Sequence, residues 1–327
     1  MISNIKRVGV MTSGGDSPGM NAALRAVVRS CHYYGLQSVG IRLGYQGLIE
    51  NDTIEMGPRS VKNIINRGGT IIKTARSKEF MTYEGRKKAY DNFKKNNLDA
   101  LVIIGGDGSF TGGLVFEKEF GVPFIGVPGT IDNDIFGTDF TIGYDTALNT
   151  AVEAMDKIRD TATSHNRVFF VEVMGRDAGF IALNSGIASG AHNILIPEQK
   201  DNIEDLFDSL NKSQASGKTS SIIVVSEGDE LMDVYDLAKA TQEKFPEYDI
   251  RVTVLGHIQR GGDPSCQDRV LASRLGLAAV EGLMAGKTSV MAGLRSSSIV
   301  YTPIEEAIKK HNEMDIDLLK VAKILAV

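Results

Sequence analysis

Residues 101–110 read LVIIGGDGSF, an apolar run that passes directly into glycines, one carboxylate and a hydroxyl. One interpretation is a tight turn from a strand into a helix, in which glycine adopts a positive φ and Asp107 caps the helix. The other is a phosphate site, where the missing side chains let backbone N–H groups approach an anion while Asp107 holds a metal ion. This stretch alone does not distinguish the two.

The same pattern recurs along the chain. Strand-like runs occupy residues 6–12, 38–43, 100–106, 123–129, 167–175, 193–197, 221–228 and 251–257, and helical patterns such as 21–34, 85–97, 147–161 and 202–214 lie between most of them. Strands that are apolar on both faces and alternate with helices indicate parallel sheets with helices on each side. In such sheets ligands bind beyond the carboxyl ends of the strands, which is where this chain places its glycines and charges. We therefore predict an α/β fold with a mostly parallel sheet in each domain.

The composition narrows the class of protein. The chain has 327 residues, 42% of them hydrophobic and 24% charged, which fits a globular protein of two domains or one large α/β unit. The formal charge of −5 argues against nucleic acid as the main partner. Only Cys31 and Cys266 are present, which suits a reducing cytoplasm without a disulfide framework. The start of the chain has no signal-like apolar stretch, and no run is long enough to span a bilayer. We expect a cytoplasmic protein that does not bind membranes.

A first group of polar residues follows two of the predicted strands. The stretch 127–139, VPGTIDNDIFGTD, contains Thr130, Asp132 and Asp134, and the two aspartates share one side if the segment is extended. Local turns made by Asp and Asn are the alternative. Together with Asp107 and with Arg76 in the segment TARS, these carboxylates indicate Mg²⁺ and polyphosphate chemistry.

A second group follows the later strands and consists of Arg167, Arg176, Arg251, His257 and Arg260. Arginine suits phosphate because its planar guanidinium donates two parallel hydrogen bonds. Surface salt bridges would explain any one of these arginines, but explain several at strand ends less well. Glu227, after the strand-like run SIIVVS, is a natural acceptor for substrate hydroxyls. His311, by contrast, lies in a helical pattern and is interpreted as a partly buried or solvated side chain.

These segments together resemble the bacterial type of ATP-dependent 6-phosphofructokinase. The most specific pieces are TSGGDSPGMNA (12–22), IGGDGS (104–109), PGTIDND (128–134), VEVMGR (171–176) and GHIQRGG (256–262), which occur in the order of the family. The resemblance implies two α/β domains in a homotetramer that phosphorylates fructose 6-phosphate to fructose 1,6-bisphosphate with ATP, a step of glycolysis. By analogy to the family, we expect an ATP-binding domain at 1–143 plus 258–308 and a fructose 6-phosphate-binding domain at 144–257 plus 309–327.

The resemblance also implies roles for individual residues. Asp132 matches the general base that takes the proton of the sugar C1 hydroxyl, and the catalytic set is completed by Arg176, Thr130 and Arg76. ATP would be bound by Gly15, Arg76, Ser77, Asp107, Gly108 and Ser109, with Asp107 holding Mg²⁺. Fructose 6-phosphate would be contacted by Thr130, Asp132, Asp134, Met174, Gly175, Arg176, Glu227, His257 and Arg260. Arg167 and Arg251 match residues that reach the same sugar phosphate from a neighbouring subunit.

The phosphoryl donor can also be predicted from this resemblance. Pyrophosphate-dependent relatives typically carry Asp where this chain has Gly108 and Lys where it has Gly129. An added acid at the first position would obstruct the α-phosphate of ATP, so both glycines favour ATP.

A second, regulatory site is implied only in part. In regulated relatives it binds ADP or phosphoenolpyruvate, and Arg25, Arg29, Arg159, Gly190 and Lys218 match it. Three positions depart from the family: an arginine is replaced by Pro58, a glutamate by His192 and a lysine by Ser216. Asn166 stands where some relatives have a glutamate that repels substrate in the inactive state. We therefore expect effector control to be weak.

Two other functions compete with this interpretation. One is a different kinase with a GGDG loop, acting on another sugar phosphate or on NAD. The segments PGTIDND and GHIQRGG weigh against an NAD or lipid kinase, which shares only the glycine-rich element. The other is a catalytically silent subunit that binds sugar phosphate and regulates a partner. The presence of Asp107, Asp132 and Arg176 argues against such a subunit.

Overall fold

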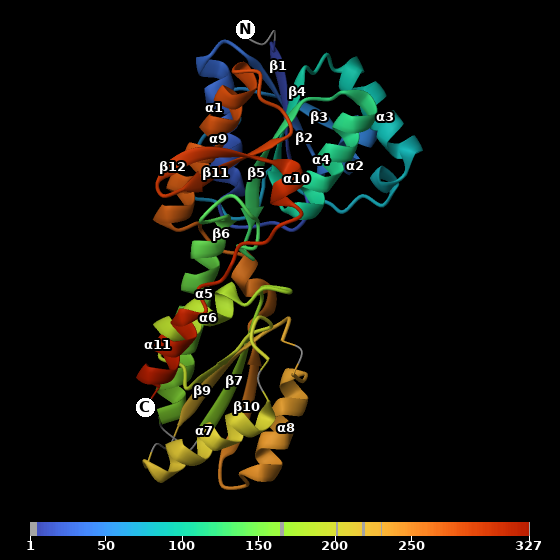
Figure 1. Ribbon diagram of the computed structural model, residues 1–327. Helices are drawn as coiled ribbons and strands as arrows, with labels where there is room; N and C mark the ends of the chain where they lie inside the picture. Colours follow the sequence, from blue (N-terminus) through green and yellow to red (C-terminus); the bar gives the residue numbers. More distant parts are fainter. Residues whose placement is uncertain (1–4, 164–166, 201, 218–219, 230, 327) are drawn as a thin grey trace. The chain divides into compact units, whose positions relative to one another are not determined.

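The computed structural model describes residues 5–163, 167–200, 202–217, 220–229 and 231–326 (Figure 1). The chain divides into two compact units, and each is described by itself. The first unit contains the described residues up to Ile131 together with Ile135–Thr146 and Arg260–Asn312. The second contains Asp132–Asp134, Ala147–Gln259 and the described residues from Glu313 on.

The first unit is built on an eight-stranded sheet with the order β12-β11-β5-β4-β1-β2-β3, in which β6 also pairs with β5. Its central strands are parallel, whereas β3 and β12 run antiparallel to their neighbours β2 and β11. The strands are β1 (Arg7–Thr12), β2 (Gln37–Ile41), β3 (Thr53–Met56), β4 (Ala100–Gly105), β5 (Phe124–Thr130), β6 (Ile142–Gly143), β11 (Val290–Arg295) and β12 (Ser298–Pro303).

Helices cover both faces of this sheet because alternate residues of its strands point to opposite sides. Val102 and Ile104 of β4 belong to one core, and Leu101 and Ile103 belong to the other. The first core is completed by α1 (Met20–Tyr33) and α9 (Cys266–Met284). The second is completed by α2 (Gly44–Glu50), α3 (Tyr83–Lys95), α4 (Asp107–Phe120) and α10 (Ile304–Ala307).

The second unit is a smaller sheet of four parallel strands with the order β10-β7-β9-β8. The strands are β7 (Arg167–Val173), β8 (Asn193–Leu195), β9 (Ser221–Ser226) and β10 (Asp249–Val254). One face is covered by α7 (Ile203–Ala215) and α8 (Val234–Lys244), which share a core with the sheet through Leu206, Leu210 and Leu237. The helices α6 (Phe180–Ala188) and α11 (Asp317–Leu325) pack on each other and on β8.

The predicted fold class is confirmed: mostly parallel sheets carry helices on their faces, and each strand-like run of the sequence overlaps a strand. The strands β3, β6, β11 and β12 are additions that the sequence pattern did not predict, and of these β3 and β12 run antiparallel to their neighbours β2 and β11. Among the described residues, no helix is long and apolar enough to cross a membrane.

Candidate active site

Two glycine-rich loops meet at the carboxyl ends of the central strands of the first unit. β1 and β4 are parallel neighbours, so the loops that follow them begin side by side, and the backbone N–H of Ser13 donates to the carbonyl of Ile104 at 3.0 Å. A Cβ added to Gly105 would lie 2.5 Å from the Ser13 carbonyl oxygen. Gly105 is therefore required by the close approach of the two backbones.

Asp107 is the first residue of α4, directly after the N-cap residue Gly106. The first N–H groups of a helix have no partner within the helix and favour negative charge, so this end of α4 suits a phosphate group. A Cβ added to Gly108 would meet no atom within 4 Å. The space beside Gly108 is therefore open, as a site for a nucleotide phosphate requires.

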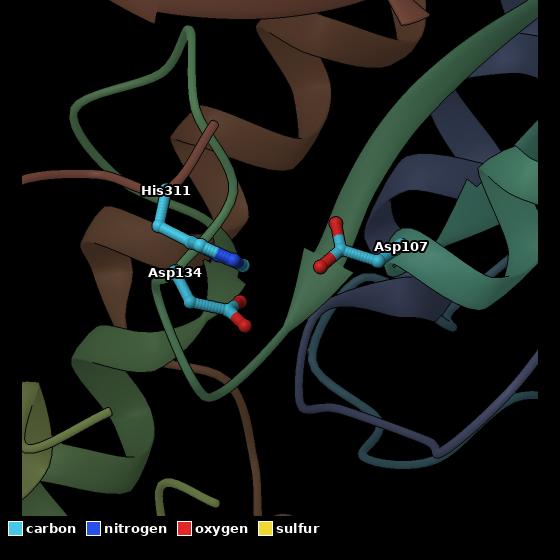
Figure 2. A group of neighbouring side chains, drawn as sticks. All are labelled: Asp107, Asp134 and His311. Atoms are coloured by element: carbon cyan, nitrogen blue, oxygen red, sulfur yellow. The ribbon is translucent and has the colours of Figure 1, made fainter. Parts of the chain in front are cut away.

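His311 lies beside Asp107 in the first unit, which the sequence did not predict. Ligand atoms of the two side chains lie within 4.8 Å of each other, and the imidazole points toward the carboxylate (Figure 2). The expected helical setting of His311 is wrong, because its backbone forms an isolated β-bridge with Ile135. No motif signals this histidine, since the bridge joins residues far apart in the chain. Asp134, also drawn in Figure 2, belongs to the second unit.

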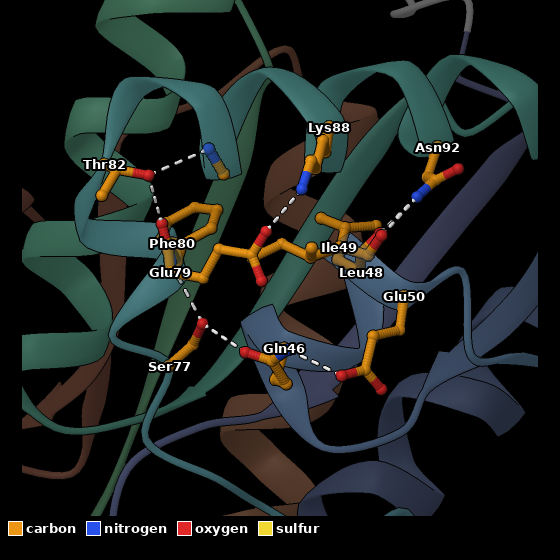
Figure 3. A network of polar contacts seen from close by, with 11 residues as sticks. Gln46, Leu48, Ile49, Glu50, Ser77, Glu79, Phe80, Thr82, Lys88 and Asn92 are labelled. Atoms are coloured by element: carbon orange, nitrogen blue, oxygen red, sulfur yellow. Dashed lines mark hydrogen bonds and ion pairs between the residues drawn. The ribbon is translucent and has the colours of Figure 1, made fainter.

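The segment around Arg76 is attached to the loop after β1. The Thr74 hydroxyl donates to the carbonyl of Gly14 at 2.8 Å, and the side chain of Arg76 is exposed. Ser77 belongs to a polar network that ties this segment to α2, since its hydroxyl donates to Gln46 Oε1 at 2.7 Å and accepts from the N–H of Phe80 at 3.1 Å (Figure 3). Ser77 thus has a structural role whether or not it also contacts ATP.

Arg260 and Gly15 are in contact within the first unit. Arg260 Nη1 donates to the carbonyl of Asp16 at 3.2 Å, and a Cβ added to Gly15 would lie 2.8 Å from the same nitrogen. Arg260, predicted to bind sugar phosphate, therefore touches Gly15, predicted to bind ATP, within this unit.

Thr130 is buried at the end of β5, where its carbonyl accepts a hydrogen bond from the Thr141 hydroxyl at 2.7 Å.

Asp132 and Arg176 are paired in the second unit. The Asp132 side chain is almost fully buried, at 3% exposed, whereas that of Arg176 is 53% exposed, and Arg176 Nε lies 3.6 Å from Asp132 Oδ2. A half-exposed guanidinium thus faces a buried carboxylate within this unit.

Arg167 and Arg251 are brought together by a third residue, Asp249. The strands β7 and β10 pair with Arg167 opposite Asp249, so Arg167 Nε lies 2.8 Å from Asp249 Oδ2 and Arg251 Nη2 lies 2.9 Å from Asp249 Oδ1. The hydrogen bond from Arg167 is the main cause that lowers the pKa of Asp249. Sequence reasoning missed Asp249, because only the register of β10 on β7 reveals it.

Met174, Gly175 and Glu227 follow the neighbouring strands β7 and β9. The N–H of Glu227 donates to the carbonyl of Val173 at 2.9 Å, so the two loops leave the sheet together. Burial, together with the charges of Asp233 and Glu227, raises the pKa of Glu172 on β7.

His257, another residue predicted to contact fructose 6-phosphate, is exposed in the short helix η2 (Gly256–Arg260).

The predicted effector residues are distributed over both units. Arg25 and Arg29 lie on α1 of the first unit, where burial and the charge of Arg29 lower the pKa of Arg25. In the second unit, Arg159 Nη2 donates to the carbonyls of Ser189 and Gly190. Lys218 and Asn166 lie outside the described residues.

His192 borders a cavity of about 610 Å³ between β8, α7 and α11, which Ser216 also lines. Its Nε2 lies 2.9 Å from the Ser209 hydroxyl, and Asp205 and Asp208 also line the cavity. Imidazole is a poor ligand for Mg²⁺, which prefers oxygen donors.

Known proteins are similar to this chain in sequence and in fold over nearly its whole length. It is 54% identical over 326 residues to ATP-dependent 6-phosphofructokinase 2 of Bacteroides thetaiotaomicron, covering 100% of both chains. It is 53% identical over 322 residues to ATP-dependent 6-phosphofructokinase 1 of Thermus thermophilus, covering 98% of this chain and 100% of that one.

Solved structures agree with this relationship. The phosphofructokinase of Saccharomyces cerevisiae matches with a TM-score of 0.89 and 38% identity, covering 93% of this chain and 45% of that one. A pyrophosphate-dependent phosphofructokinase from Marinobacter aquaeolei, with a TM-score of 0.84 and 23% identity over 97% of this chain and 91% of that one, shows a likeness of fold alone. The family described as Phosphofructokinase matches residues 7–283, and the chain belongs to this family.

Proposed function

We propose that this chain transfers the γ-phosphoryl group of ATP to fructose 6-phosphate and forms fructose 1,6-bisphosphate. The observation that carries the proposal is the pair formed by the buried Asp132 and Arg176, whose Nε lies 3.6 Å from Asp132 Oδ2. Such a pair provides a base for the attacking hydroxyl and a cation for the transferring phosphoryl group. The full-length similarity to ATP-dependent 6-phosphofructokinases supports it.

In the proposed reaction, Asp132 accepts the proton of the sugar C1 hydroxyl as that oxygen attacks the γ-phosphorus. Arg176 stabilises the negative charge on the phosphoryl oxygens during transfer. Thr130 and Asp134 belong to the same motif and orient the acceptor, while Arg76 stabilises the phosphates of ATP. The protein contributes mainly position and charge, as is general for phosphoryl transfer.

ATP is proposed to bind the first unit through Gly15, Arg76, Ser77 and the start of α4 from Asp107 to Ser109. Mg²⁺ fits here, because Asp107 offers a carboxylate oxygen beside the N-terminus of a 14-residue helix, and Mg²⁺ favours few carboxylates plus substrate oxygens. When bound, the ion would neutralise charge on the ATP phosphates. The open space at Gly108 supports ATP over pyrophosphate as the donor.

Fructose 6-phosphate is proposed to be held by Met174, Gly175, Glu227, His257 and Arg260. Arg167 and Arg251 are proposed to reach the 6-phosphate of a neighbouring subunit's site in a homotetramer. Their common partner Asp249 supports a shared task, because it keeps two cations together that would otherwise repel each other. We place the reaction in the cytoplasm.

Effector control is proposed to be weak, although Arg25, Arg29 and Arg159 match the effector site of the family. An effector shifts a conformational equilibrium only by its different affinity for two states. His192 in place of a carboxylate and its contact with Ser209 support a loss of metal-dependent binding of ADP.

The experiment that tests the proposal is a coupled assay of fructose 1,6-bisphosphate formation from ATP and fructose 6-phosphate. Phosphorylation of fructose 6-phosphate, with less activity on other sugar phosphates and on NAD, is the expected result. Activity only on another acceptor would indicate a different kinase. Binding of fructose 6-phosphate without turnover in either case would indicate a silent regulatory subunit.

A further inference from the structure

The backbone of Arg176 is in a conformation that side chains rarely adopt. Its φ is 53°, in the left-handed region, and the preceding Gly175 has a φ of 148°. For a residue with a side chain, this region is sterically unfavourable. Such a conformation persists only where the surroundings hold it, and it is typical of functional sites.

The backbone of Arg176 lies close to Gly228, in the loop after β9. A Cβ added at Gly228 would lie 1.8 Å from the carbonyl oxygen of Arg176, 2.7 Å from its carbonyl carbon and 3.1 Å from the Cα of Asp177. All three atoms belong to the backbone, so no side chain could rotate away to make room. The bare Cα of Gly228 is thus packed directly against the peptide group of Arg176.

The two loops that make this contact are themselves fixed. β7 and β9 pair in parallel with Val173 opposite Ser226. The loop after β7 closes tightly, because the N–H of Ala178 donates to the carbonyl of Gly175 at 3.0 Å. The loop after β9 closes through two hydrogen bonds, from the N–H of Asp229 to Ser226 O at 3.0 Å and from the N–H of Leu231 to Asp229 Oδ1 at 2.9 Å. The two loops are also joined where they leave the sheet, because the N–H of Glu227 donates to the carbonyl of Val173 at 2.9 Å.

We propose that Gly228 is a positioning residue for phosphoryl transfer, which acts by holding the Arg176 backbone in its left-handed conformation. This conformation directs the guanidinium to within 3.6 Å of Asp132. A methyl group at 228 would force the Arg176 carbonyl to retreat by about 1.6 Å to reach an ordinary contact distance of 3.4 Å, and a misplacement of about 1 Å can already cost ~10²-fold in rate. The inference rests on the proposed catalytic role of Arg176.

The test is a double-mutant cycle in the full chain, with Gly228→Ala, Arg176→Ala and the double variant. Gly228→Ala is expected to lower kcat by ~10–100-fold. KM for ATP is expected to change little, because the residues proposed to bind ATP belong to the first unit. In the Arg176→Ala background, Gly228→Ala should reduce kcat by less than ~2-fold, because residues that act as a unit are not additive.

A matched control separates positioning from crowding. Gly186 of α6 is also buried in the second unit, and a Cβ added there would lie 2.7 Å from Ile194 Cδ1. Gly186→Ala should therefore lower the melting temperature while kcat stays within ~2-fold of wild type, since Gly186 does not contact Arg176.

A milder variant keeps the test decisive if Gly228→Ala does not fold. Asp229→Ala removes the acceptor of the Leu231 N–H, which weakens the loop that carries Gly228 without adding atoms next to Arg176. It is expected to lower kcat by ~3–10-fold, again only when Arg176 is present. Equal losses of kcat with and without Arg176, or normal kcat in Gly228→Ala, would overturn the inference. If the wild-type chain failed to phosphorylate fructose 6-phosphate, the proposed function itself would fall.

Discussion

Substitution of Asp268 by Ala should destabilise the start of α5 (Tyr144–Thr163). Asp268, on α9, is 1% exposed. Its carboxylate accepts from the N–H of Gly143 at 2.8 Å, from the N–H of Thr146 at 2.8 Å and from the Thr146 hydroxyl at 2.5 Å. The first N–H groups of a helix have no partner within the helix, so Asp268 caps α5 from a distant part of the sequence.

The expected loss follows from the two backbone donors that Asp268→Ala leaves without an acceptor. Each unsatisfied buried donor costs ~1–3 kcal/mol, so the pair costs about 2–6 kcal/mol. The lower part of this range is expected, because burial raises the pKa of Asp268 and the substitution also removes an unfavourably buried charge. The Thr146 hydroxyl can rotate to another partner and is not counted.

Hydrogen exchange of the amides of residues 142–150 measures this loss directly, without assuming that the two units unfold together. Because ~1.4 kcal/mol corresponds to a factor of ten, the lower half of the range, about 2–4 kcal/mol, should reduce protection by roughly 30-fold to 700-fold. Gln267→Ala, one residue earlier on α9 and exposed, is the control and should change protection by less than ~2-fold. If Asp268→Ala kept protection within ~3-fold of wild type, the reasoning about the cap would be wrong.

Three further predictions concern the reaction. Asp132→Ser should lower turnover by ~10²–10⁴-fold with little change in substrate affinity; near-normal turnover in a steady-state assay, with loss of fructose 6-phosphate binding, would contradict its role as base. Arg251→Ala should raise KM for fructose 6-phosphate more than it lowers kcat, because the 6-phosphate does not react; mixing it with Arg260→Ala should restore some activity, and no recovery at any ratio would argue against a site shared between subunits. Millimolar ADP or phosphoenolpyruvate should barely shift the fructose 6-phosphate saturation curve at fixed ATP; a large shift that disappears in Arg25→Ala would show a working effector site.

The parallel part of the fold could be predicted because its strands are continuous apolar runs followed by glycine. The hairpin of β11 and β12 could not. Its two-residue turn is Ser296–Ser297, with φ of 44° and 66°, and hairpin turns with positive φ are normally signalled by Asn or Gly. β12 is also only partly buried along most of its length, so it lacks the pattern of a core strand.

The candidate site was predictable where its residues lie in motifs and not where tertiary structure brings them together. Asp132 and Arg176 are recognisable from PGTIDND and VEVMGR. Asp249, in contrast, becomes part of the site through the register of β10 on β7, and His311 through its bridge to Ile135. Neither pairing can be predicted from the spacing of residues along the sequence.

The division of the chain into alternating segments has a consequence for biosynthesis. β5 pairs with β11, so the first unit's sheet lacks two strands until residues 290–303 have left the ribosome. Helix α9, which covers one face of that sheet, is also made late. For most of translation the nascent chain therefore presents β5 as an open, apolar strand edge, which is a template for wrong pairing. We expect the first unit to complete its folding only near the end of synthesis, after most of the second unit has been made.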